Sequence, residues 1–217
     1  MIVGSILLAF GIDAWWSERA ERAEEAEAVA QLAIDFRSNA TRLDIVRGYH
    51  ERALDASYEV LALGGMGGER RGDQPVAELV GNLLSAWTYD PVLGGINSLI
   101  QAGKLGILRS DSLRVAVAGW PDLVRDLNED EHREQETMFN QLDPYLMAKG
   151  AMFEAQMAKR NFRRLPPRPA ADLTSLAQDS LFLQMVSFRA IRLEEVLAEV
   201  DIVDASIHRI LRLMEQN

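Results

Sequence analysis

The sequence has no cysteine, which excludes disulfide bridges and metal sites built on thiolates. Proline and glycine are scarce over one long stretch, because Ser17 to Leu63 contains no proline and has Gly48 as its only glycine. These two residue types most often interrupt helices. The stretch therefore predicts a single long helix that ends at about Leu63, before the glycines that follow.

Basic residues are also few for a chain of 217 residues. There are 23 lysines and arginines against 33 aspartates and glutamates, a formal net charge of −10. Nucleic-acid binding depends on neutralising phosphates with basic side chains, and so does binding to anionic lipid headgroups. This charge balance argues against nucleic acid and against a polybasic membrane surface. We therefore expect protein partners.

Histidine, the commonest metal ligand, occurs only 3 times. Glu129 and His132 form one Glu-x-x-His pair within an acidic run. A di-iron bundle needs two such pairs, and neither His50 nor His208 has a glutamate three residues before it. We expect no metal here, and we interpret the acidic run as a solvated helix face.

No motif for nucleotide binding or nucleophilic catalysis is present. The glycine cluster at residues 64–68 follows a helix, whereas phosphate-binding glycine loops follow a strand. Gly103-Lys104 lacks the remaining residues of a Walker motif, and no G-x-S-x-G sequence occurs. We expect no cofactor, and we expect that the protein is not an enzyme.

The first sixteen residues, MIVGSILLAFGIDAWW, are the most informative segment that is present. As a helix they would extend about 24 Å, somewhat less than a hydrocarbon core of about 30 Å. We interpret residues 1–16 as a transmembrane anchor, with a start codon expected upstream of Met1. Asp13, Trp15 and Trp16 would lie at the membrane interface, where indole rings are enriched. Small residues would allow close helix packing in the membrane, namely Gly4, Ser5, Ala9 and Gly11.

Residues 17–217 are expected to form one helical bundle domain, so that the fold class is all-α with a transmembrane helix continuing into a long-helix antiparallel bundle. After the helix ending at Leu63, further helices are predicted in five places. They span about 75–87, a segment ending in a left-handed cap at Gly103, 110–142 with a kink or restart at Pro121, 143–160, and 179–215. Residues 161–172 are expected to be a loop because they hold three prolines. That loop also carries a small basic patch, Arg163, Arg164 and Arg168.

The last predicted helix has the clearest heptad pattern. Apolar residues recur at the seam positions Leu193, Val196, Val200, Val203, Ile207, Ile210 and Met214. Such a seam can pack against the first long helix inside the bundle or form an intermolecular coiled coil. The first helix has its own seam, which Asn39 and His50 interrupt with polar side chains.

The N-terminal motif, formed by Gly11, Asp13, Trp15, Trp16, Glu18 and Arg19, resembles the start of an uncharacterised family of bacterial single-pass membrane proteins. The stretch from Ile96 to Trp120 is similar to the family's helix–glycine–turn–helix element. The resemblance implies a protein of the bacterial cytoplasmic membrane with its bundle on the periplasmic side. A literal count of Arg19 and Arg22 beside the span gives the opposite orientation. The family supplies a topology and no reaction.

Two functions of different classes follow from this reading. The first is a non-catalytic accessory or scaffold subunit that docks on other membrane-protein subunits, for example in a photosynthetic or respiratory assembly, with the bilayer as its second partner. The alternative is an extracytoplasmic ligand-binding sensor whose pocket is lined by residues such as Trp87, Trp120 and Tyr145. A hydrolase or metalloenzyme would instead require titratable groups clustered in a cleft.

Overall fold

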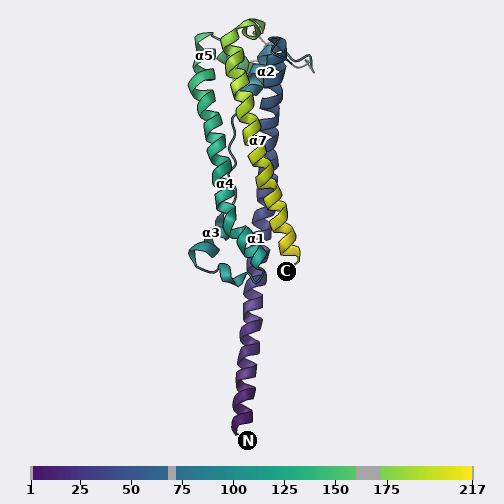
Figure 1. Ribbon diagram of the computed structural model, residues 1–217, viewed down its shortest axis with the longest axis vertical. Coiled ribbons are helices and arrows are strands. Elements are labelled where there is room, and N and C mark those ends of the chain that lie inside the picture. Colours follow the sequence, from purple (N-terminus) through teal and green to yellow (C-terminus); the bar gives the residue numbers. More distant parts are fainter. Residues whose placement is uncertain (1, 68–71, 160–171, 217) are drawn as a thin grey trace. The chain divides into compact units, whose positions relative to one another are not determined.

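The computed structural model describes residues 2–67, 72–159 and 172–216, apart from the side chains of residues 2–9 and 159. Over these ranges every regular element is helical and none is a strand, which confirms an all-α bundle (Figure 1). The α-helices are α1 (Ile2–Leu63), α2 (Val76–Leu83), α3 (Gly94–Gln101), α4 (Asp111–Thr137), α5 (Asp143–Ala148), α6 (Met152–Lys159) and α7 (Ser180–Glu215). Short 3-10 turns are η1 (Leu105–Ile107) and η3 (Thr174–Gln178), and η2 (Met138–Leu142) is a π-helical turn.

Helix α1 extends without interruption over 62 residues and ends at the predicted position. Gly65 adopts a left-handed φ of +73° immediately after the helix. The N–H of Met66 then donates to the carbonyl of Leu61 at 3.0 Å. This is the hydrogen bond of a Schellman cap, for which glycine is the favoured residue.

The middle of the chain agrees with the sequence at some helix ends and differs at others. Gly103 has a φ of +66° and closes α3 as predicted, and the hydroxyl of Ser110 accepts from Leu113 N–H at 3.3 Å at the start of α4. The predicted helix over 75–87 is shorter, because α2 ends at Leu83. Helix α4 includes Pro121, so no restart occurs there.

The single helix predicted over 143–160 is wrong. The chain breaks between α5 and α6, where Gly150 adopts a φ of +68°. The N–H of Ala151 donates to the carbonyl of Leu146 at 2.9 Å, which closes α5 with the same kind of cap that ends α1. Gly150 was the available signal for this break in the sequence.

The described helices form two compact units. Unit 1 comprises Met1–Arg42, Asp90–Leu123 and Asp204–Asn217, and unit 2 comprises Leu43–Tyr89 and Val124–Val203. Within unit 2, α7 lies antiparallel to α1, since Arg47 of α1 pairs with Asp201 and Tyr58 donates to Glu194. The predicted seam residues of α7 are interior, with Leu193, Val196, Val200, Val203, Ile207 and Ile210 at 0% exposed and Met214 at 8%.

In unit 1, side chains of α1 hold the irregular connection that follows Tyr89. Asn39, which is fully buried, donates to the carbonyl of Val92 at 3.0 Å and accepts from the N–H of the same residue at 2.6 Å. The carboxylate of Asp35 accepts from Gly95 N–H at 3.2 Å. A Cβ on Gly95 would lie 2.6 Å from that carboxylate oxygen, so only glycine allows this approach. The polar interruption of the α1 seam at Asn39 is therefore an anchor point for the connection.

We expect Asn39→Ala to destabilise the protein by about 1–3 kcal/mol, because it removes two hydrogen bonds and leaves the half-buried N–H and carbonyl of Val92 without these partners. Urea unfolding of the full-length chain measures the loss. Asn128→Ala is the matched control, since Asn128 donates only to Val124, four residues earlier in its own helix. Equal effects from the two substitutions would contradict the anchoring role of Asn39.

Candidate functional site

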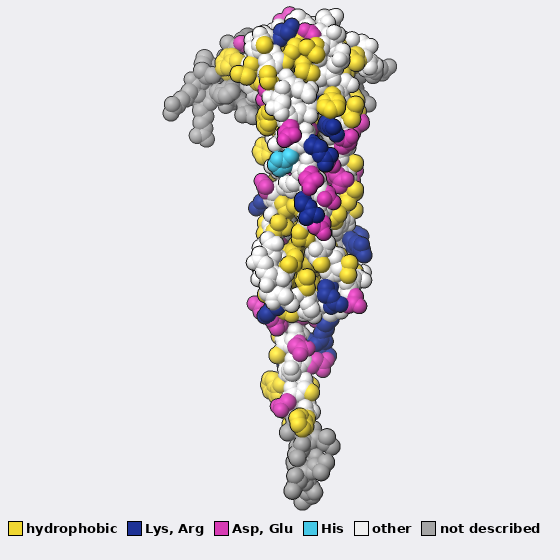
Figure 2. All heavy atoms as spheres, turned by 60° about the vertical axis from the view of Figure 1, so that its left-hand side comes forward, with side chains coloured by type: hydrophobic (Ala, Val, Ile, Leu, Met, Phe, Trp, Pro, Cys, Tyr) yellow, Lys and Arg dark blue, Asp and Glu magenta, His cyan; other side chains and the backbone are white. Residues whose placement is uncertain are grey.

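The first described turns of α1 have no packing neighbour. Every residue from 10 to 24 is exposed, including Phe10 at 68%, Ile12 at 49%, Trp15 at 55% and Trp16 at 60%. Because successive residues of a helix are turned by about 100°, Ile12, Trp15 and Trp16 share one side of α1 and Phe10 lies on the other. Figure 2 shows hydrophobic and charged side chains mixed along this part of the chain. In the sequence, residues 2–12 include no charged residue, whereas charged residues follow from Asp13 onward.

The residues predicted for the membrane interface lie together at this exposed start. The rings of Trp15 and Trp16 meet edge to face with centroids 5.2 Å apart, and the guanidinium of Arg19 lies 5.8 Å from the Trp15 ring. Asp13 is exposed beside them. A Cβ on Gly11 would meet no atom within 4 Å. The side chains of Gly4, Ser5 and Ala9 are outside the described part of the chain.

No helix of the described residues has the combination of length and hydropathy that a bilayer span requires.

Where the exposed part of α1 ends, Arg109 joins it to the turn before α4. The backbone N–H of Arg109 donates to Glu25 at 2.7 Å, and its guanidinium lies 3.4 Å from the second oxygen of the same carboxylate. Glu21 and Glu18 lie 3.7 and 4.0 Å from the guanidinium. The single side chain of Arg109 therefore lies close to carboxylates from two successive turns of α1 and fixes the turn on the helix.

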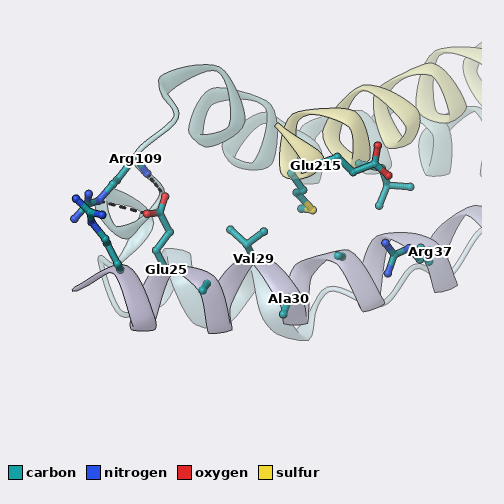
Figure 3. Close-up of a pocket in the computed structure, with 11 residues that line it drawn as sticks. Glu25, Val29, Ala30, Arg37, Arg109 and Glu215 are labelled. Carbon is teal, nitrogen blue, oxygen red and sulfur yellow. Dashed lines mark hydrogen bonds and ion pairs between the residues drawn. The ribbon is translucent and has the colours of Figure 1, made fainter. Parts of the chain in front are cut away.

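A groove of about 550 Å³ opens beside this contact, between α1 and the last turns of α7 in unit 1 (Figure 3). The side chain of Val29 points from α1 towards α7 in this view, and the pair of Glu25 and Arg109 closes one end. The apolar lining consists of Ala26, Val29, Ala30, Ala33, Leu211 and Met214, and the charged lining of Arg22, Glu25, Arg37, Arg109 and Glu215. The volume is typical of sites that bind ligands or side chains of a partner.

In unit 2, a second polar cluster is completely buried. Nε2 of His50 lies 3.2 Å from Oε1 of Glu131, and Oε2 of Glu131 accepts from the N–H of Tyr89 at 2.9 Å. His50 is 1% and Glu131 0% exposed. The sequence predicted that the acidic run of α4 is a solvated face. Glu129 and His132 are indeed exposed, but Glu131 of the same run is buried.

The same cluster contains an ion pair between α4 and α7. Nη1 of Arg189 lies 2.6 Å from Glu134, and Nη2 donates to the carbonyl of Ser85 at 2.8 Å. Burial raises the pKa of Glu134, an effect that the guanidinium opposes. Burial likewise lowers the pKa of Arg189. The neighbouring carboxylates of Glu134 and Asp143 act in the opposite direction and raise it. Arg189 and Glu134 are at most 1% exposed, and their ion pair joins α4 to α7 in the interior of unit 2.

No group of three or more potential ligand side chains that could hold a metal ion occurs among the described residues.

The aromatic residues named for a sensor pocket each have a ring neighbour instead. Trp120 is fully buried, with its ring centroid 5.0 Å from that of Phe36 in unit 1. In unit 2, Trp87 stacks on Tyr49 at 4.0 Å and Tyr145 stacks on Phe182 at 5.8 Å. None of the three lines the groove of Figure 3. Arg163, Arg164 and Arg168 are outside the described residues.

The sequence analysis identified His50 as a polar interruption of the α1 seam. It did not identify Glu131, which His50 contacts, or the nearby pair of Glu134 and Arg189. Glu131, Glu134 and Arg189 were all detectable, because each occupies a position that heptad spacing assigns to the core of its helix. Arg189 lies seven residues before Val196, a core position of α7. A charged residue at such a position predicts a buried ion pair once its partner helix is known.

Comparison with known protein families, with curated proteins and with solved structures gives no match. The resemblance to bacterial single-pass membrane proteins consequently depends on the motifs of this sequence alone.

We expect Arg189→Met to destabilise the protein by about 3–5 kcal/mol at neutral pH, because it leaves the Glu134 carboxylate buried without its cation. The folded-state pKa of Glu134 is raised above its unfolded value. Its protonated form therefore stabilises the fold below the unfolded pKa of about 4.3, and this contribution is lost as the pH rises through the folded pKa. The deficit of Arg189→Met should accordingly shrink on acidification.

Urea unfolding at several pH values tests this expectation. Arg133→Met, an exposed arginine of α4, is the control and should cost less than about 0.5 kcal/mol. The double variant Arg189→Met/Glu134→Met should recover most of the loss, since it removes both charges together. A deficit that is independent of pH, or that grows on acidification, contradicts the proposed burial of an uncompensated carboxylate.

Proposed function

We propose that the protein is a non-catalytic, membrane-anchored accessory or scaffold subunit that docks on a larger integral-membrane complex. The observation that supports this most directly is the exposure of Phe10, Ile12, Trp15 and Trp16 at the start of α1, where the sequence of residues 2–12 holds no charged residue. A helix that docks on one partner keeps a charged or polar face towards water. A charge-free segment that ends in two tryptophans fits a bilayer, which surrounds a helix evenly and has an interface that favours indole rings.

The charged turns after Trp16 fit the same assignment. Glu18 and Arg22 pair along the helix, and Arg109 and Lys104 bind glutamates of the next turns, with Lys104 2.7 Å from Glu24. Glutamates and basic side chains that form ion pairs with one another can remain in water beside the lipid headgroups. The fixed turn between η1 and α4 would hold unit 1 next to the membrane. A neighbouring membrane subunit would complete the short span, which is our reason for proposing a subunit of a complex.

The alternative function, a tethered ligand-binding sensor, would need the groove of Figure 3 rather than the predicted aromatic pocket. In that groove Arg22, Glu25 and Arg109 already form ion pairs within unit 1, and the apolar lining is alanine, valine, leucine and methionine without an aromatic ring. The predicted aromatic pocket is therefore not the groove, and we favour the scaffold.

We expect Trp15→Ala/Trp16→Ala to weaken membrane association by at least about tenfold, because each tryptophan contributes about 1.5–3 kcal/mol when it leaves water. Co-sedimentation of the full-length chain with phosphatidylcholine and phosphatidylglycerol vesicles measures this. Trp87→Ala is the matched control, as Trp87 is 45% exposed but belongs to unit 2. A wild-type chain that remains in the supernatant would overturn the membrane assignment.

A further inference from the structure

The groove in unit 1 exposes a second helical seam on α1. Arg22, Ala26, Val29 and Ala33 follow one another at spacings of four, three and four residues, and all line the groove. This spacing is the one with which a helix meets a partner helix. The stripe lies beside the interior one of Leu32, Phe36 and Leu43, which α1 uses for its own core, and Val29, seven residues before Phe36, borders both.

Small side chains give this seam its depth. Ala26, Ala30 and Ala33 form the α1 side of the groove, and Leu211 and Met214 form the α7 side. A wall of alanines leaves room for larger side chains from an approaching helix, as knobs that enter holes. A third helix could therefore pack against both α1 and α7 at this groove.

The charges along the groove identify the occupant. Arg22, Glu25 and Arg109 already have ion partners within unit 1. Arg37 and Glu215 line the groove as well, are exposed, and have no ion partner among the residues that the structure describes. A surface with one uncommitted cation and one uncommitted anion complements a copy of itself, because a two-fold axis can bring each charge to its opposite.

We infer that the groove is the interface of a two-fold homodimer, in which the Ala26–Val29–Ala33 seam packs on the same seam of a second copy and Arg37 of each copy pairs with Glu215 of the other. The inference rests on the proposed function in one respect. A common membrane aligns two α1 helices in parallel, the direction that a two-fold axis along the membrane normal requires, and it raises their effective concentration.

The test measures the mass of the full-length chain in detergent micelles by light scattering coupled to size exclusion, with the detergent mass subtracted. Wild type should have twice the chain mass. Ala26→Trp fills the groove from an exposed position and should give a monomer with an unchanged helical circular-dichroism spectrum. Ala20→Trp is the matched control, because Ala20 is exposed, does not line the groove and is turned by about 120° from Ala26 around α1, so it should leave the dimer intact.

Charge reversal examines the pairing. Arg37→Glu and Glu215→Arg should each weaken the dimer by about tenfold, since one reversal places like charges together at both symmetric contacts. The combination Arg37→Glu/Glu215→Arg should restore it. A monomeric wild type overturns the inference, as does a dimer that Ala26→Trp and the single reversals leave unchanged.

Co-sedimentation with vesicles distinguishes a failure of the dimer inference from a failure of the proposed membrane anchor. A monomer that still sediments with vesicles would overturn the dimer and leave the anchor supported. A dimer that stays in the supernatant would support the interface and overturn the anchor.

Discussion

The structure depends on the polar side chains that α1 carries within its apolar seam. Asp35 and Asn39 satisfy the backbone of Gly95 and Val92, and Glu25 satisfies the backbone N–H of Arg109. The connection between α2 and α3 has no regular structure, so its N–H and carbonyl groups need partners from elsewhere. Buried polar groups that lack a partner are costly, and these side chains supply the partners while α1 itself remains unbroken. A purely apolar seam would pack equally well and leave the connection without a fixed position.

The sequence predicted the parts of the fold that depend on local signals. The end of α1 and the cap at Gly103 follow from glycines at helix ends. The extent of α7 follows from its heptads. The missed break at Gly150 had the same kind of signal, but the aspartate–proline pair before it suggested one longer helix. A local sequence pattern does not show which of several glycines ends a helix, because the packing around the helix decides this.

The buried ion cluster could not be assembled from sequence for a different reason. Glu134 and Arg189 occupy core positions of helices that are distant in the chain. Heptad spacing shows that each is buried, but it does not show which two helices face each other. Their mutual contact at 2.6 Å depends on the three-dimensional arrangement of unit 2. Replacing such a pair by apolar residues often costs little, whereas an unmatched member costs several kcal/mol, so the two residues must occur together in the sequence.

The exposed start of α1 and the groove beside it raise one question, namely what excludes water from apolar surface that the chain itself does not cover. The two surfaces differ in geometry. Residues 2–12 hold no charged residue, and Phe10 and Ile12 point to opposite sides of α1, a pattern that fits the proposed lipid surroundings. At Ala26 and Ala33 the apolar side chains form one stripe flanked by opposite charges, a pattern that a single helix satisfies. In the proposed assignment, one continuous helix changes its environment within about three turns, from lipid to protein, and Glu25, which Arg109 binds, lies where the change would occur.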